Sequence, residues 1–280
     1  MTPQNGPDSV VAALAASARS ALDAARVAMR DVAAAGLSAP GPLDHETGVV
    51  LTTQNIEGFV DADFPIAARL AGELDGPPVF LDRDTVMAAI GEGTIGAAQG
   101  IRDFVYLTVS TGVGGAIVSG GRMIRGATNT AGELGHFPVG FDTNVRCRCR
   151  SYGCVEAYAS GRNLAEAFGV ADASIVYAKA AAGDARAIVL IGRAEAALAS
   201  LAVGIVNALN PERIVVGGSI AEHEPAHVLA PMRQAIAERA FKVPAAAVSV
   251  VPSALRGDVS IIGSALAARD RANGEGRWFL

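Results

Sequence analysis

The sequence predicts an α/β protein with two related lobes around a cleft. Helical and extended segments alternate along both halves of the chain, as they do in layered α/β folds. The second half opens with three short strands joined by glycine-containing turns, and the first half lacks this opening. We therefore expect a duplicated architecture in which the first lobe, residues 1–102, is missing its opening strands and the second lobe covers residues 103–280.

The composition is that of a folded globular chain. Of its 280 residues, 51% are hydrophobic and 18% are charged, so a sizeable core can be buried. The net charge of −5 gives neither the basic footprint of a nucleic-acid-binding protein nor a polybasic membrane anchor. The N-terminal sequence lacks the basic and apolar parts of a secretory signal. We expect a cytoplasmic protein with no nucleic-acid partner and no membrane partner.

The first half of the chain alternates between helices and short strands. Apolar residues recur at helical spacing after Asp8 and Ser9, either of which can cap a helix. A Pro-Gly-Pro turn at residues 40–42 ends a short strand. In order, we predict a helix over 10–29, a strand within 32–42, an extended piece within 48–59, a helix over 66–74, a buried strand over 78–82 and a helix over 85–99.

The second half begins with an antiparallel meander. Short apolar runs alternate there with glycine turns, which is typical of hairpins. We predict strands over 104–110, 116–120 and within 122–126, a glycine turn over 111–115, helices between 161 and 210, and strands within 211–219 and 247–253 that are separated and followed by helices.

All three cysteines of the chain lie within eight residues, at Cys147, Cys149 and Cys154. An odd and tightly packed set is a poor disulfide framework, and a Cys-x-Cys pair is strained. Zinc prefers four tetrahedral nitrogen or sulfur ligands, and His136 can be the fourth. Four protein ligands leave no open position, so this zinc would be structural. The alternative is a loop of reduced thiols.

Two pairs of acidic residues are candidates for the chemistry. Asp84 follows a buried strand, and ligands bind at the carboxyl ends of strands in open α/β folds. It can act as a general base, or it can cap the next helix, and Asp82 has the same two alternatives. A zinc ion would also fix Glu133 and Glu156, which could then hold sugar hydroxyls. The alternative for these two is a pair of solvated acids.

Two glycine-rich turns can approach a ligand closely. One follows a predicted strand at residues 111–115, and the other is Gly217-Gly218, between a strand and a helix. Consecutive backbone N–H groups in such turns can cradle a phosphate. Taken alone, each is equally compatible with a plain hairpin or a tight turn.

Taken together, these segments resemble the ROK family of sugar kinases and repressors. Residues 107–136 resemble the family's signature segment. Residues 147–161 resemble its cysteine motif, where the family carries CGCG-x-x-GC-x-E. The similarity extends over residues 10–270 and includes segments 36–51, 79–92 and 210–219 and the loop around Asn55.

The resemblance implies an actin-like ATPase (ribonuclease H-like) fold and the phosphorylation of a hexose or N-acetylhexosamine by Mg-ATP. It also implies a structural zinc and a homodimer. Asp84 resembles the catalytic base that takes the proton from the sugar hydroxyl. The remaining roles implied are sugar binding by Asn55, Glu133, His136 and Glu156, zinc binding by His136, Cys147, Cys149 and Cys154, and nucleotide binding by Thr111, Gly112, Gly114, Gly217 and Gly218.

Two departures from the family pattern bear on activity. No D-x-G-G-T turn, which holds ATP phosphates in the family, occurs in this sequence, and the first sheet would be left with an exposed edge. Arg83 stands where the family has an asparagine, and it would lower the pKa of Asp84 if the two paired. We therefore expect a weakly active or inactive kinase homologue. The alternatives are a non-catalytic sugar-binding protein or a regulator of the same family.

Overall fold

The computed structural model describes residues 6–51, 62–140, 145–275 and 278. The chain forms two compact units, each built from separate stretches of sequence. Unit 1 comprises Met1–Gly91, Arg125–Thr130 and Asp258–Leu280, and unit 2 comprises Glu92–Ile124 and Ala131–Gly257. The sequence predicted a single boundary after residue 102. The observed division differs from it because the last helix of the chain packs on the first strand of unit 1.

Unit 1 contains a two-stranded parallel sheet in its described residues. Strand β1 pairs with β4 along its whole length, with Ala35 opposite Val79 and Ala39 opposite Arg83. The elements of unit 1 are α1 (Pro7–Ala25), η1 (Met29–Asp31), β1 (Ala35–Ala39), β2 (Leu43–Asp44), β3 (Val49–Val50), α2 (Ile66–Glu73), β4 (Val79–Arg83), the first two turns of α3 (Asp84–Ile95) and α11 (Val259–Ala272).

The first helix is placed slightly differently from the prediction. It starts at Pro7, where a proline at the first helical turn loses no hydrogen bond. Ser9 therefore lies inside the first turn, where its hydroxyl donates to the carbonyl of Gly6 at 3.0 Å. The helix ends at Ala25 because Arg26 adopts a left-handed conformation, with φ of 57°.

Close backbone contacts hold α11 against its neighbours in unit 1. A Cβ on Gly36 of β1 would lie 2.0 Å from the carbonyl oxygen of Ser264, and a Cβ on Gly263 would lie 1.7 Å from that of Met87. Only glycine leaves room for such an approach. The only tryptophan of the chain, Trp278, is 1% exposed and belongs to the same unit.

Unit 2 contains a five-stranded mixed sheet in the order β7-β6-β5-β8-β9. The predicted meander is present, since β5 and β6 pair antiparallel and β6 and β7 do so too. Strand β5 also pairs in parallel with β8, as β8 does with β9. The strands are β5 (Phe104–Val109), β6 (Val113–Ser119), β7 (Arg122–Ile124), β8 (Arg213–Gly217) and β9 (Ser249–Pro252).

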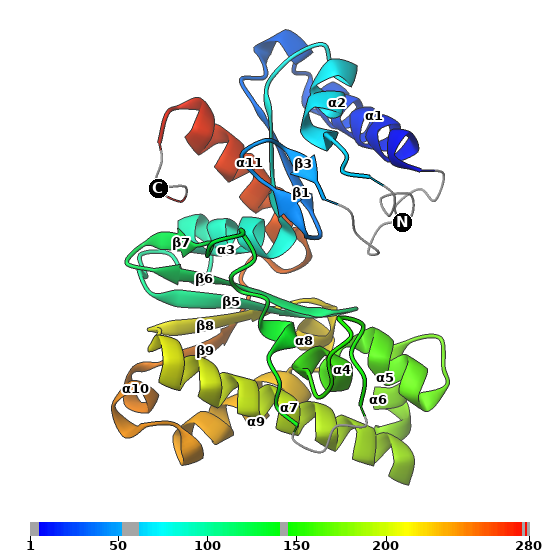
Figure 1. Cartoon of the computed structure of the whole chain (residues 1–280), viewed down its shortest axis with the longest axis vertical. Coiled ribbons are helices and arrows are strands. Elements are labelled where there is room, and N and C mark those ends of the chain that lie inside the picture. Colours follow the sequence, from blue (N-terminus) through cyan, green and yellow to red (C-terminus); the bar gives the residue numbers. More distant parts are fainter. Residues whose placement is uncertain (1–5, 52–61, 141–144, 276–277, 279–280) are drawn as a thin grey trace. The chain divides into compact units, whose positions relative to one another are not determined.

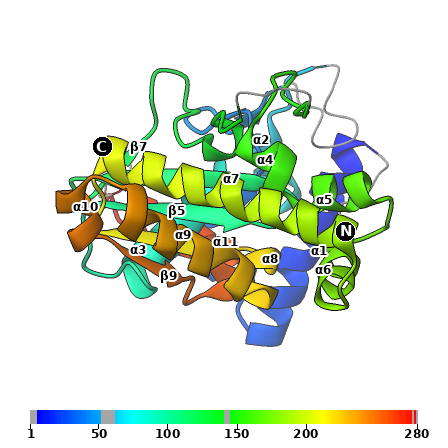
Figure 2. The ribbon, with the colours of Figure 1, turned by 90° about the horizontal axis from the view of Figure 1, so that it is seen from below.

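The helices α7 and α9 run side by side across one face of this sheet (Figures 1 and 2). By length and composition α7 could cross a membrane, but Leu198, Leu201 and Ile205 are 1–3% exposed in the core of unit 2. It is therefore the core helix of a globular unit. The helices are α4 (Val155–Ala159), α5 (Gly161–Phe168), α6 (Ala173–Ala181), α7 (Ala185–Leu209), α8 (Ser219–His223), α9 (Pro225–Arg239) and α10 (Lys242–Ala247), with 3-10 turns η2 (Leu134–His136) and η3 (Arg256–Asp258).

A buried carboxylate joins two segments of unit 2 that are far apart in sequence. Glu92 lies in α3 and is 0% exposed. Its Oε1 accepts hydrogen bonds from the hydroxyl of Ser253 and from the N–H of Leu255, and its Oε2 accepts one from the N–H of Ala97. The end of α3 is thereby tied to the segment that follows β9.

Candidate functional site

Asp84 is the first residue of α3 and directly follows β4. Its Oδ1 accepts the backbone N–H of Thr85 at 2.8 Å, so the carboxylate satisfies a donor at the helix start. The residue is nevertheless exposed. The sequence left helix capping and action as a base as alternatives for Asp84. In this position the two roles are compatible.

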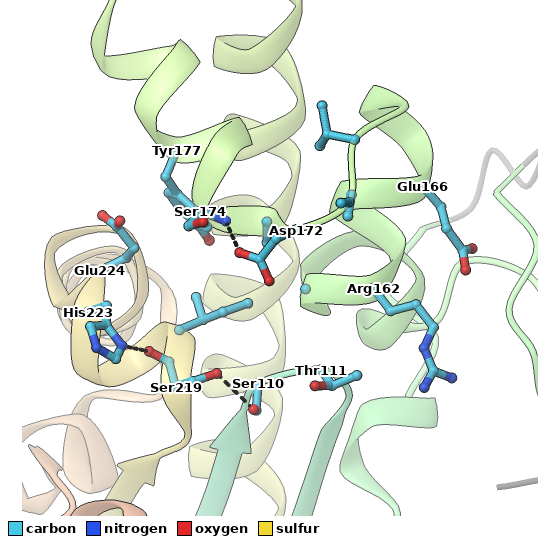
Figure 3. A pocket seen from close by; sticks show the side chains of 16 residues that line it. Ser110, Thr111, Arg162, Glu166, Asp172, Ser174, Tyr177, Ser219, His223 and Glu224 are labelled. Carbon is cyan, nitrogen blue, oxygen red and sulfur yellow. Dashed lines mark hydrogen bonds between the residues drawn. The ribbon is translucent and has the colours of Figure 1, made fainter. Parts of the chain in front are cut away.

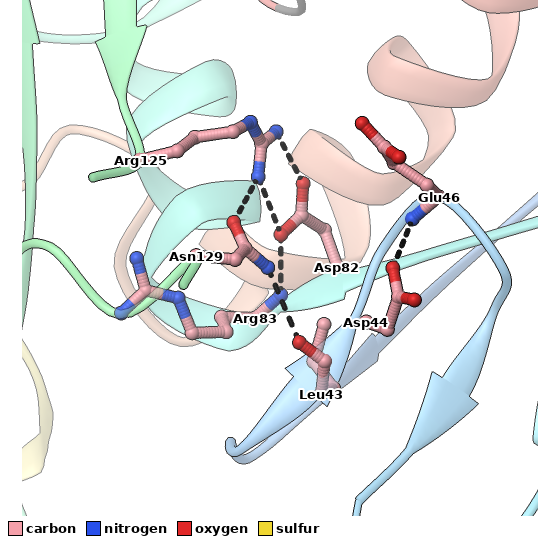
Figure 4. A network of polar contacts seen from close by, with 7 residues as sticks. All are labelled: Leu43, Asp44, Glu46, Asp82, Arg83, Arg125 and Asn129. Atoms are coloured by element: carbon pink, nitrogen blue, oxygen red, sulfur yellow. Dashed lines mark hydrogen bonds and ion pairs between the residues drawn. The ribbon is translucent and has the colours of Figure 1, made fainter. Parts of the chain in front are cut away.

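Asp82, two residues earlier, has a different environment. It is 1% exposed, and its Oδ2 forms an ion pair with Nη2 of Arg125 at 2.7 Å. Its Oδ1 accepts from Nη1 of Arg125 at 3.2 Å and from the N–H of Arg83 at 2.9 Å (Figure 4). A buried carboxylate whose oxygens are engaged in this way is not available as a base for a substrate.

Arg83 is 3% exposed, and its side chain runs past the backbone of Gly41. A Cβ on Gly41 would lie 3.4 Å from Cδ of Arg83. In Figure 4 the guanidinium of Arg83 extends away from Asp82. The effect of Arg83 on the pKa of Asp84 stays a prediction.

The four residues predicted to bind zinc come together in unit 2. Their donor atoms all lie within 4.8 Å of one another. Sγ of Cys147 is 3.7 Å from Nδ1 of His136, and Sγ of Cys149 is 3.7 Å from Sγ of Cys154. Two sulfurs bound at about 2.3 Å to a tetrahedral zinc would be about 3.7–3.8 Å apart. The donor set and its spacing therefore fit this metal.

Burial raises the pKa of the Cys154 thiol to about 12, and it also raises the pKa of Cys147. Such thiols stay protonated at neutral pH unless a cation takes the place of the proton. The ring orientation matters as well, because Nδ1 of His136 faces Sγ of Cys147. The other ring nitrogen, Nε2, is left for another partner.

Glycines of the signature segment allow η2 to lie directly on β6. A Cβ on Gly135 would lie 1.8 Å from the carbonyl oxygen of Val113, and one on Gly115 would lie 2.6 Å from Cδ1 of Leu134. The sequence placed Gly114 and Gly115 in a turn, whereas both lie inside β6. The turn itself is Ser110–Gly112, closed by the bond from the N–H of Ser110 to the carbonyl of Gly112 at 2.9 Å.

Glu156 connects the cysteine loop to this turn. Its Oε2 accepts the N–H of Val113 at 3.1 Å and lies 3.0 Å from where a Cβ on Gly112 would stand. The carboxylate is thus held, not freely solvated. Glu133 precedes η2 and is exposed, and its carbonyl accepts the N–H of His136 at 3.1 Å.

A pocket of about 540 Å³ lies within unit 2, a volume typical of small-molecule sites (Figure 3). Ser110 and Thr111 follow β5 and Ser219 follows β8, so the pocket is at the carboxyl ends of two parallel strands. The hydroxyls of Ser110 and Ser219 are 2.9 Å apart. The side chains that line its other walls include Arg162, Glu166, Asp172, Ser174, Tyr177 and Glu224.

Of the residues predicted to bind nucleotide, Thr111 lines the pocket, and the four glycines adjoin it or lie in the sheet. A Cβ on Gly217 would lie 2.6 Å from Oη of Tyr106. Gly218 has a φ of 94°, and its Cβ would lie 2.6 Å from Oγ1 of Thr108. Packing against β5 is thus sufficient to require glycine at both positions.

The sequence reasoning missed the far wall of the pocket. Oδ1 of Asp172 accepts the N–H of Ser174 at 2.8 Å, and hydrogen bonding with Ser174 lowers the pKa of Asp172. Burial raises the pKa of Tyr177. The one local signal was that Asp172 directly precedes a helix, which by itself points only to a cap. Asn55, predicted to bind sugar, lies outside the described residues.

The fold of the chain is that of actin-like ATPases. A ROK hexokinase from Thermus thermophilus matches it with a TM-score of 0.80 and 34% identity, over 98% of this chain and 90% of that one. A family model described as "ROK family" matches residues 2–271, and the chain therefore belongs to this family. Both the fold class and the family predicted from the sequence are confirmed.

Curated relatives of known activity cover most of the chain. A glucokinase from Halalkalibacterium halodurans is 31% identical over 262 residues, which is 87% of this chain and 78% of the relative. An N-acetylmannosamine kinase from Escherichia coli is 36% identical over 243 residues, covering 85% of this chain and 78% of the relative. These relatives are sugar kinases, and they confirm the enzyme class predicted from the sequence.

Proposed function

We propose that this chain transfers the γ-phosphoryl group of Mg-ATP to a hydroxyl of a hexose or N-acetylhexosamine, giving a sugar phosphate and ADP. The observation that carries the proposal is the similarity to sugar kinases over more than four fifths of the chain. Asp84 is the general base. It accepts the hydroxyl proton as the sugar oxygen bonds to the γ-phosphorus and the bond from that phosphorus to the bridging oxygen breaks.

The sugar is bound by Glu133, His136, Glu156 and Asn55. The hydrogen bond from Val113 gives the carboxylate of Glu156 a fixed orientation, which favours directional bonds to hydroxyls. Nε2 of His136 is suited to the same purpose because Nδ1 faces Sγ of Cys147. Glucose, N-acetylglucosamine, N-acetylmannosamine and fructose are the sugars to compare.

The nucleotide occupies the pocket of unit 2. Its volume and its position at the carboxyl ends of β5 and β8 support this assignment. Thr111 and the turn that contains Gly112 are its predicted phosphate-side residues.

A structural zinc held by His136, Cys147, Cys149 and Cys154 completes the proposal. With four protein ligands it would fix the loop that carries Glu156 and would not activate water. Elemental analysis of freshly purified protein should give one zinc per chain, and well under one would contradict the assignment. We further propose that the protein is a cytoplasmic homodimer. Light scattering measures the molar mass in solution and so tests the oligomeric state.

The deciding experiment is ADP release with Mg-ATP and the panel of sugars. Turnover that is abolished by Asp84→Asn, but kept by the exposed control Asp31→Asn, supports a working kinase with Asp84 as base. Sugar binding by calorimetry without turnover would favour the alternative, a non-catalytic sugar-binding protein. If the chain shows no turnover and binds no sugar, both the kinase and the sugar-binding protein are refuted.

A further inference from the structure

We propose that the buried ion pair between Asp82 and Arg125 positions Asp84 for catalysis, so that both are positioning residues of the phosphoryl transfer. The inference rests on the proposed function only for the role of Asp84. All three residues belong to unit 1. Their spatial relation comes from hydrogen bonds that converge on the junction between β4 and α3.

The carboxylate of Asp82 connects Arg125 to the backbone just before Asp84. Both oxygens of Asp82 accept from the guanidinium, at 2.7 and 3.2 Å, in the two-pronged geometry that fixes orientation as well as distance. Oδ1 also accepts the N–H of Arg83 at 2.9 Å. One oxygen thus serves the arginine and the residue adjacent to Asp84 at once (Figure 4).

Arg125 is itself fixed from its other side. Its Nη1 donates to Oδ1 of Asn129 at 2.8 Å, and Nδ2 of Asn129 donates to the carbonyl of Leu43 at 3.3 Å. The series of contacts therefore runs from β2 through the segment Arg125–Thr130 to the end of β4. Each member has a partner on both sides, so the arrangement has little freedom.

Burial makes this arrangement specific. The side chain of Asp82 is 1% exposed and that of Arg125 is 14% exposed, so either charge without the other would be strongly disfavoured. A lysine keeps the charge but cannot make two parallel hydrogen bonds to one carboxylate. Replacing Arg125 by lysine should therefore preserve the fold and release the orientation of Asp82.

A loss of orientation would act on catalysis through Asp84. A base must lie within hydrogen-bonding distance of the proton it accepts, and a misplacement of about 1 Å can cost about 100-fold in rate. The nucleotide pocket is built from unit 2 residues alone. The expected signature is thus a fall in kcat of about 10- to 100-fold with the KM for ATP unchanged.

The test compares Arg125→Lys with Asn129→Ala, which removes the hydrogen-bond acceptor of Arg125 Nη1 but keeps both buried charges. The matched control is Arg69→Lys, because Arg69 forms an exposed ion pair with Asp8 in the same unit, at 2.6 Å. We expect Arg125→Lys and Asn129→Ala to lower kcat and to weaken sugar binding in calorimetry, with an unchanged KM for ATP. The control variant should keep the original kcat, sugar affinity and KM for ATP. Hydrogen exchange of the Arg83 amide should become faster in Arg125→Lys only.

The outcomes separate this inference from the proposed function. If Asp84→Asn abolishes turnover while Arg125→Lys and Asn129→Ala leave kcat and sugar affinity intact, the positioning role is wrong. If the unmodified chain shows no turnover, the proposed function fails. The positioning role is then tested by sugar binding alone, and we expect Arg125→Lys to weaken it as much as Asp84→Asn does. If Arg125→Lys binds the sugar as tightly as the unmodified chain, the positioning role is wrong.

Discussion

Replacing Glu92 with glutamine should destabilise unit 2 by about 1–3 kcal/mol, although the two side chains have nearly the same shape. The carboxylate is 0% exposed and accepts from two backbone N–H groups, those of Leu255 and Ala97, and from the hydroxyl of Ser253. A glutamine has one oxygen and one NH₂ group. In either orientation the NH₂ faces one of the two backbone donors, and a buried donor left without a partner costs about 1–3 kcal/mol.

Glu92→Ala should cost more, about 3–5 kcal/mol, because all three donors lose their acceptor and a cavity remains. Urea unfolding followed by far-ultraviolet circular dichroism measures both changes as shifts in the midpoint. Glu238→Gln is the control, since Glu238 is exposed and accepts a hydrogen bond from Gln234 of its own helix. A glutamine variant within about 0.5 kcal/mol of the original protein would refute the reasoning, because that range is typical of surface substitutions.

Three further predictions concern unit 2. Gly135→Ala places a Cβ 1.8 Å from a carbonyl oxygen of β6, so a loss of about 1–3 kcal/mol is expected in thermal unfolding, and an unchanged Tm would contradict the packing described. Cys154→Ser should reduce zinc to well below one per chain by elemental analysis, whereas retention of a full equivalent would exclude Cys154 as a ligand. Hydrogen bonds from Gly120 and Ser119 hold the pKa of Asp103 below its usual range. Its stabilising contribution is therefore present above the unfolded pKa of about 3.9 and lost as pH falls through the folded value. Asp103→Asn should narrow the difference between urea midpoints at neutral and acid pH, and an equal difference would contradict this.

Local sequence patterns predicted the elements better than the contacts between them. The meander and the cluster of His136 with the three cysteines could be predicted because turn glycines, apolar runs and metal-binding residue types lie close together in the sequence. The assignment of Gly114 and Gly115 to a turn shows the limit. The sequence does not distinguish a glycine that a turn requires from one that must leave room for a packed side chain. At Gly115 that side chain is Leu134, which is nineteen positions away.

The far wall of the pocket could not be predicted for a related reason. Asp172, Tyr177 and Glu224 come from α6 and the end of α8, and they meet only because the helices pack around the ends of β5 and β8. The return of α11 to β1 is equally non-local, since it depends on the space left by Gly36. The ion pair of Asp82 joins residues 43 positions apart, and no local pattern in the sequence indicates that Asp82 and Arg125 pair with each other.

The burial of Trp278 gives the protein an intrinsic optical probe. It is the only tryptophan of the chain and lies in unit 1, so indole emission reports on that unit while unit 2 is silent at the same wavelength. Unfolding of unit 1 exposes the indole to water and shifts its emission to the red. Recording emission and circular dichroism in one urea titration therefore compares the two units without any label. Coincident transitions would mean that they unfold as one cooperative body, and separate ones would give each unit its own stability.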